Sequence, residues 1–166
     1  MTNKMKKELE LYIHIPFCVR KCAYCDFRSA PAGREVQAQY VDRLLEEIRE
    51  AAPLTEDYEV VSAFFGGGTP SILPEEEIGR VMDLLHRQFD WKADAEVTIE
   101  ANPGTVDGRK LDAYRSFGIN RISFGLQSAD NEELQKLGRI HTWEQFLESH
   151  ESARAAGFTN INVDLM

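Results

Sequence analysis

Short β-branched or aromatic runs alternate with longer helical patterns along the whole chain, and this rhythm restricts the fold more than any other feature. We expect strands at 11–15, 60–65, 96–101, 119–124 and 160–166, where the apolar runs are short and bounded by turn residues. Because a helical pattern separates each pair of strands, the sheet should be parallel, with right-handed crossover connections.

The helical segments carry both apolar faces and end signals. The helix after the first strand should bury one face, made of Val36, Tyr40, Leu44, Leu45 and Ile48. Pro74 should open the next helix, whose buried face would be Ile78, Val81, Met82 and Leu85. Capping-box spacings predict the starts of two later helices, at Asp130 with Glu133 and at Thr142 with Gln145.

Polar or glycine residues follow nearly every predicted strand, at the end where parallel barrels place their chemistry. Together with the even spacing of the strands, this favours a closed or partly closed barrel over an open Rossmann sheet. The chain ends in strand sequence at Asp164, Leu165 and Met166, so a barrel cannot close within it. We therefore expect a fragment of a longer protein, with an N-terminal extension at 1–10 and an incomplete core domain at 11–166. A half-barrel that dimerises is less favoured, because an unpaired sheet edge is a liability.

The charge balance excludes some classes of partner. The formal net charge is −9, so the attraction to phosphate that dominates non-specific nucleic-acid or anionic-membrane binding is missing. No apolar run is long enough to span a bilayer, and the charged N-terminus lacks a signal-peptide pattern. We expect a cytoplasmic protein.

The chain has three cysteines, Cys18, Cys22 and Cys25, which form C-x3-C-x2-C just after the first predicted strand. An odd, clustered set is a poor disulfide framework and is more typical of a metal site in a reducing compartment. Thiolates are the usual ligands of a [4Fe–4S] cluster, and three of them leave the fourth iron open to a small chelating ligand. Structural zinc, with His14 as a fourth ligand, and three inert buried cysteines are the less favoured alternatives.

The stretch YIHIPFCVRKCAYCDF resembles the signature of the radical S-adenosylmethionine (SAM) superfamily, in its coproporphyrinogen-oxidase-like branch. The stretches FFGGGTPSIL, TIEANPGT, ISFGLQS, LGRIHT and INVDLM follow in that family's order. The resemblance implies an α/β fold, the partial (β/α)6 TIM-like barrel of radical SAM proteins, here truncated after about five strands. It also implies a [4Fe–4S] cluster on the three cysteines with SAM on its open iron, where an electron from the cluster can generate a 5′-deoxyadenosyl radical.

The same resemblance implies which residues contact SAM. They are Tyr12, Tyr24, Gly67, Gly68, Thr69, Glu100, Gln127, Arg139 and Asp164. The chemistry is suitable, since glycines let the backbone approach a ligand and an arginine can clamp a carboxylate in bidentate fashion. The alternatives are a plain tight turn for the glycines and structural hydrogen bonds for the polar residues. No catalytic residue is assigned beyond the cluster ligands.

Two members of this branch resemble the chain. One is the oxygen-independent coproporphyrinogen III oxidase (dehydrogenase), which decarboxylates propionates, and the other is the HemW-type haem chaperone. The oxidase typically has a fourth cysteine directly after the third, where this chain has Asp26, and a long segment before the first strand, which here starts near Leu11. We therefore expect the chaperone, with the oxidase as the alternative and a plain iron–sulfur module as a third class. The partners implied are SAM, haem or coproporphyrinogen III, and an electron donor such as flavodoxin or ferredoxin.

Overall fold

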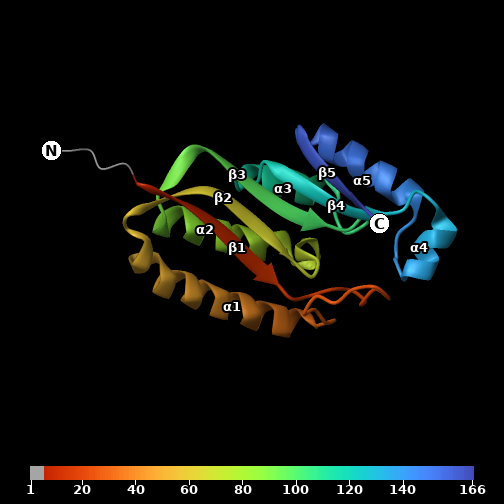
Figure 1. Ribbon diagram of the computed structural model, residues 1–166, viewed down its shortest axis with the longest axis horizontal. Coiled ribbons are helices and arrows are strands. Elements are labelled where there is room, and N and C mark those ends of the chain that lie inside the picture. Colours follow the sequence, from red (N-terminus) through yellow and green to blue (C-terminus); the bar gives the residue numbers. More distant parts are fainter. Residues whose placement is uncertain (1–5) are drawn as a thin grey trace.

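The computed structural model describes residues 6–166, which form one five-stranded sheet in the order β1-β2-β3-β4-β5. Every neighbouring pair of strands is parallel, as predicted. The elements in chain order are β1 (Lys7–Ile15), α1 (Arg34–Ala51), η1 (Ala52–Thr55), β2 (Tyr58–Gly67), η2 (Pro70–Ile72), α2 (Glu75–Gln88), β3 (Trp91–Ala101), α3 (Gly108–Ser116), β4 (Arg121–Gln127), α4 (Asn131–Leu137), α5 (Trp143–Ala155) and β5 (Asn160–Leu165) (Figure 1).

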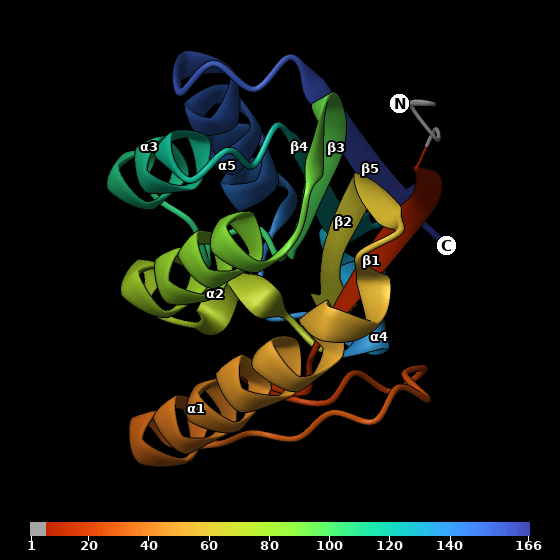
Figure 2. The ribbon, with the colours of Figure 1, turned by 90° about the vertical axis from the view of Figure 1, so that its left-hand side faces the viewer.

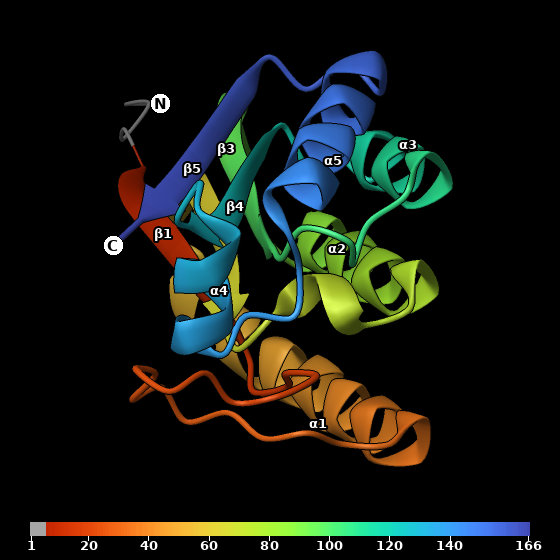
Figure 3. The ribbon, with the colours of Figure 1, turned by 90° about the vertical axis from the view of Figure 1, so that its right-hand side faces the viewer.

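Helices α1, α2, α3 and α5 cover one face of the sheet (Figure 2). The short helix α4 lies instead near the C-terminal ends of the strands, beside the loop that follows β1 (Figure 3). Strands β1 and β5 are the two edges of the sheet. The fold is therefore the α/β arrangement of a partial, unclosed TIM-like barrel, as the strand–helix rhythm predicted.

The hydrophobic core lies between the sheet and these four helices. Its sheet side includes Ile15, Phe65, Ile99 and Phe124, all fully buried. The predicted face of α2 is confirmed, since Ile78, Val81, Met82 and Leu85 are buried. No helix within residues 6–166 is long and apolar enough to cross a membrane.

The predicted face of α1 was partly wrong. Val36 is exposed, and the buried positions of this helix are Gln37, Val41, Leu45 and Ile48. These positions are spaced so that they lie on one face of the helix, toward the core. Gln37 can be buried there because its side-chain amide donates to the carbonyl of Ala32 at 3.0 Å. Tyr40 lies at the edge of this face, where its hydroxyl donates to the carbonyl of His14 at 2.6 Å.

Strand β1 begins at Lys7 rather than at Leu11, so residues 7–10 belong to the sheet and not to an extension. Lys7 pairs with Tyr58 of β2, and the alternation of charged and apolar residues over 8–11 suits a strand at a sheet edge. The first five residues of the predicted extension lie outside the described part of the chain.

The helix caps position the segments that reach the strand ends. The predicted capping box of α5 is confirmed, because the side chains of Thr142 and Gln145 each accept from the other's backbone N–H. At α4, Asp130 accepts from the amides of Glu132 and Glu133, but the Glu133 carboxylate accepts from the Ser128 hydroxyl instead of completing the box. Helix α4 is thereby fixed at its start, near the C-terminal ends of the strands (Figure 3).

Candidate functional site

The structure brings most of the predicted site residues into one hollow at the C-terminal ends of the strands. The predicted residues that line this hollow are Cys18, Cys22, Tyr24, Cys25, Gly67, Gly68, Thr69, Glu100, Gln127, Arg139 and Asp164. Tyr12 is not part of the lining: it is 60% exposed, and its ring stacks on Phe64 on the open face of the sheet. Because the residues come from β2, β3, β4 and β5 as well as the cysteine loop, the hollow is a product of the whole fold.

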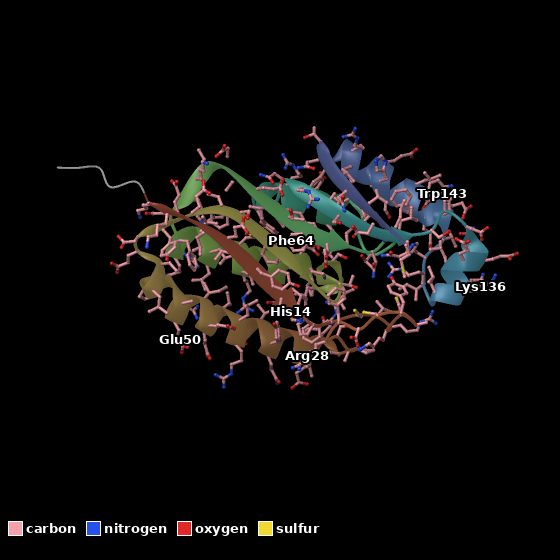
Figure 4. The ribbon with its side chains drawn as sticks, in the orientation of Figure 1. His14, Arg28, Glu50, Phe64, Lys136 and Trp143 are labelled. Atoms are coloured by element: carbon pink, nitrogen blue, oxygen red, sulfur yellow. The ribbon has the colours of Figure 1, made fainter. Side chains whose placement is uncertain are left out.

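The cysteine loop is held at its base by strand-like contacts. Phe17 and Ala30 form an isolated parallel bridge, and the amide of Cys18 donates to the carbonyl of Ala30 at 3.2 Å. Near the same point, the ring of His14 contacts the carbonyl of Arg28 at 3.4 Å (Figure 4). The three cysteines in between are free thiols of intermediate burial.

The far side of the loop rests on the end of α4. The amide of Ala23 donates to the carbonyl of Leu137 at 3.1 Å, and the Arg20 guanidinium donates to the carbonyl of Gly138 at 2.6 Å. Gly138 has a positive φ of 80°, which suits glycine at a helix C-terminus. The cysteines are therefore held between the sheet and the α4–α5 connection.

The glycine loop after β2 packs against β1 so closely that side chains would not fit. A Cβ on Gly68 would lie 2.4 Å from the carbonyl oxygen of Phe17, and a Cβ on Gly67, where φ is 108°, would lie 2.4 Å from the His14 ring. The amide of Gly68 donates to the carbonyl of Ile15 at 2.8 Å. Glycine is required at position 67 by its positive φ, and at both positions because a side chain would collide with β1 or the residues after it. An ordinary tight turn would not need this close packing.

Glu100 faces the glycine loop from the end of β3. Its carboxylate accepts from the amide of Gly67 at 3.2 Å. Burial raises the pKa of Glu100, the negative charge of Asp164 raises it further, and the hydrogen bond from Gly67 opposes both effects. A carboxylate in this position is costly to keep ionised without a positive partner, so it suits a cationic ligand.

Arg139, in the α4–α5 connection, contacts four residues from other parts of the chain. Its Nη2 donates to the side-chain oxygen of Asn102 and to the carbonyl of Gly125, both at 2.5 Å. Its Nη1 lies 3.3 Å from the sulfur of Cys22 and 3.4 Å from the hydroxyl of Tyr24. Within the described residues its Nε is buried and has no hydrogen-bond partner.

The last two strands supply a polar edge to the hollow. Asp164 accepts from the hydroxyl of Ser123 at 3.1 Å and from the amide of Asn162 at 2.8 Å. Gln127 has a φ of 77°, the only positive value at a non-glycine position within residues 6–166, where the pairing of β4 and β5 shifts register. Such backbone strain at a mouth residue is typical of functional sites.

Sequence reasoning missed several residues of the lining, among them Asn102, Ser123 and Gly125. A signal was present for Gly125, since a glycine inside a strand pattern often marks a close backbone approach. In the sequence, Asn102 is visible only as a turn residue after the third predicted strand. Its side-chain contacts depend on Arg139, which is far away in sequence, so no local pattern indicated them.

The cysteine geometry is compatible with a cluster and less so with a single ion. Within residues 6–166, no three His, Cys, Asp or Glu side chains come together in a way that could hold one metal ion. A [4Fe–4S] cluster does not need that convergence, because each thiolate binds a different iron. Three free thiols beside the guanidinium of Arg139 fit a cluster that carries a chelating carboxylate ligand.

Comparison with known proteins gives the family. The model of the radical SAM superfamily matches residues 12–166, which is nearly the whole chain. The chain belongs to the radical SAM superfamily. Membership of this family implies a [4Fe–4S] cluster and SAM, in agreement with the residues that line the hollow.

Radical SAM relatives of two kinds are similar to the chain. It is 42% identical over 159 residues to the haem chaperone HemW of Escherichia coli (strain K12), a match that covers 95% of the chain and 42% of that protein. It is 39% identical over 163 residues to the oxygen-independent coproporphyrinogen III oxidase of Salmonella typhimurium, with 97% of the chain and 35% of that protein covered. The chain thus spans less than half the length of these relatives.

The fold is also that of a solved radical SAM enzyme. The coproporphyrinogen III oxidase HemN of Escherichia coli superposes with a TM-score of 0.90 at 36% identity. The superposition covers 99% of the chain and 38% of HemN. The arrangement of five parallel strands is therefore the radical SAM arrangement.

Proposed function

We propose that this chain is the radical SAM part of a haem chaperone of the HemW type, which binds a [4Fe–4S] cluster, SAM and haem. The observation that carries the proposal is the hollow lined by three free thiols, the glycine loop, Glu100 and Arg139. These groups suit the cluster on one side and a ligand with both a carboxylate and a cationic centre on the other.

In this proposal each wall of the hollow has its own part. Cys18, Cys22 and Cys25 hold the cluster, whose chemistry when reduced is the supply of an electron to the sulfonium of SAM. Arg139 binds the carboxylate of SAM, and the backbone of Gly67 and Gly68 borders its methionine end.

The remaining residues bind the other groups of SAM. Glu100 accepts from a ribose hydroxyl or from the ammonium, while Gln127 and Asp164 bind the adenosine side. Thr69 and Tyr24 complete the wall next to the cysteines. Tyr12 lies outside the hollow, on the open face of the sheet, and would contact only a part of SAM that extends over that face.

The identity of the residue after the third cysteine supports the chaperone. Asp26 occupies the position where the oxidase typically has a fourth cysteine, and it is exposed and outside the lining of the hollow. Similar proteins named as haem chaperones include those of Escherichia coli and Bacillus subtilis, at 42% and 38% identity. Coproporphyrinogen III oxidase activity is the second candidate, supported by the close superposition on HemN.

The proposal includes an electron donor and a location. Arg20, Lys21 and Arg28 are exposed on the cysteine loop of a chain whose net charge is −9. An acidic carrier such as flavodoxin or ferredoxin would be attracted to this loop. Free thiols that must ligate iron require a reducing compartment, so we place the protein in the cytoplasm.

The test is anaerobic iron–sulfur reconstitution of the full-length protein, followed by parallel titration with haem and assay with coproporphyrinogen III, SAM and dithionite. Binding of about one haem per chain without decarboxylation is the expected result. Decarboxylation of coproporphyrinogen III would make the protein the oxidase instead. If the protein showed no haem binding and no decarboxylation, both candidate functions would be overturned.

A further inference from the structure

A single side-chain amide links the groups that contact two of the three cysteines. The side-chain oxygen of Asn102 accepts from Arg139 at 2.5 Å, and its Nδ2 donates to the hydroxyl of Thr69 at 2.9 Å. Arg139 in turn lies 3.3 Å from the sulfur of Cys22, and the Thr69 hydroxyl lies 3.6 Å from the sulfur of Cys18. One amide thereby connects both ends of the C-x3-C segment to the sheet.

Asn102 is itself held rigidly. Its backbone carbonyl accepts from the amide of Thr105 at 3.1 Å and from the hydroxyl of Thr105 at 2.6 Å. That hydroxyl also pairs with the hydroxyl of Ser71 at 2.6 Å, and Ser71 is fully buried. The turn after β3 is therefore a fixed platform on which the amide of Asn102 has a defined direction.

Gly125 makes room for the contact between Asn102 and Arg139. A Cβ at position 125 would lie 3.0 Å from the side-chain oxygen of Asn102 and 3.2 Å from Nη2 of Arg139. The absence of a side chain lets the guanidinium reach the carbonyl of Gly125 at 2.5 Å. The strand glycine, the amide and the guanidinium therefore form one unit.

We propose that Asn102 is a positioning residue, which holds Arg139 and Thr69 in the orientation that the cluster and the SAM carboxylate require. An arginine side chain has several rotatable bonds, and fixing it before the ligand arrives lowers the entropic cost of binding. Asn102 and Gly125 occupy Nη2, so the guanidinium is held beside the sulfur of Cys22 at the hollow. This role rests on the proposed cluster and SAM site.

The proposal makes Asn102 act through Arg139, and a double-mutant cycle measures that dependence. In the full-length protein with a reconstituted cluster, SAM affinity is measured by calorimetry for Asn102→Ala, Arg139→Ala and the double variant. Asn102→Ala should keep its iron and sulfide content and weaken SAM by about tenfold, the range seen when supporting residues of a metal site are removed. In the Arg139→Ala background the same substitution should change SAM affinity by less than about twofold.

The cluster itself gives a second, spectroscopic measurement of SAM binding. The electron paramagnetic resonance spectrum of the reduced cluster should respond less to SAM in Asn102→Ala than in the wild type at equal SAM concentration. Asn160→Ala is the matched control, because Asn160 is an exposed β5 amide bonded only to Glu96 among the contacts found within residues 6–166. That control should leave SAM affinity unchanged.

Unchanged SAM affinity in Asn102→Ala, or an effect that adds fully to that of Arg139→Ala, would overturn the proposed role. If Asn102→Ala does not fold, Gly125→Ala decides the question, because its new methyl group crowds the same contact, and unaltered SAM affinity there would overturn the role as well. A wild-type protein that binds no cluster would instead refute the proposed function and this role together.

Discussion

Nη1 of Arg139 lies 3.3 Å from the sulfur of Cys22, although the two residues are 117 positions apart in the chain. The contact joins the loop after β1 to the connection between α4 and α5. The environment of the cysteine loop therefore depends on a cation from the segment between β4 and β5. A positive charge next to a cluster ligand suits an anionic ligand on the neighbouring iron.

Arg139→Ala should weaken SAM binding without removing the cluster. We expect the dissociation constant for SAM to rise by about 10–100-fold, because a buried carboxylate would lose its charged partner. The measurement is calorimetric titration of the reconstituted protein, with iron content determined on the same sample. Arg43→Ala, on the exposed surface of α1, is the control. Full SAM affinity in Arg139→Ala would remove the assignment of this residue.

Gly68→Ala should disrupt the site where Gly108→Ala does not. The new methyl group at position 68 would lie 2.4 Å from the carbonyl of Phe17, whereas nothing lies within 4 Å of the equivalent point at Gly108. Overpacking of this kind costs about 1–3 kcal/mol. Urea unfolding should therefore show that loss for Gly68→Ala, together with poor cluster incorporation, and little change for Gly108→Ala. Equal stability of the two variants would mean that the glycine loop is not in contact with β1.

SAM binding should weaken at acidic pH through Glu100. Its pKa is raised above the ordinary 4.5 by burial and by Asp164, so it takes up a proton at a higher pH than an exposed glutamate. Protonation removes the negative charge that faces the cationic ligand, so affinity should fall as the pH is lowered, and at a higher pH than for an exposed glutamate. Glu100→Gln should bind SAM more weakly and lose this dependence. Parallel pH profiles for the two proteins would argue against Glu100 as the titrating group.

His141 should make the fold less stable in acid. It is buried, its Nε2 contacts the carbonyl of Leu126 at 3.2 Å, and burial together with the charge of Arg139 lowers the pKa of its ring to about 4. The unfolded chain binds a proton near pH 6.5, so stability is retained above that value and lost as the pH falls from about 6.5 towards 4.

The expected loss for His141 is about 2 kcal/mol in the free energy of unfolding between pH 7 and pH 5. Urea unfolding of the wild type and of His141→Gln at both values measures it, since glutamine does not titrate and the carboxylates are the same in both proteins. The wild type should lose more stability than the variant. The same loss in both would show that His141 is not the responsible group.

Local patterns in the sequence were enough to predict the sheet, and the resemblance to the radical SAM superfamily indicated most residues of the hollow. The glycines after β2 and the acid at the end of β3 are strand-end features, and parallel strands bring their C-terminal ends to one side. The exposed Val36 and the early start of β1 at Lys7 were missed, because which residues of a helix or edge strand face the core depends on the final packing.

The finer geometry of the site is a tertiary property. The contact of Asn102 with Arg139 spans 37 positions, and the close packing of Gly68 on Phe17 joins the segments that follow β2 and β1. The positive φ of Gln127 arises where β4 and β5 change register, which no residue pattern near Gln127 indicated. Tyr12 was assigned by resemblance, and it lies outside the lining of the hollow, with its ring stacked on Phe64.

The most direct test of the central claim is electron paramagnetic resonance of the anaerobically reconstituted, dithionite-reduced protein, with and without SAM. We predict about four irons per chain, a [4Fe–4S] signal that changes when SAM binds, and loss of the cluster in Cys22→Ala but not in Val19→Ala on the same loop. A wild-type protein without a cluster, or a cluster whose signal is the same with and without SAM, would contradict the account.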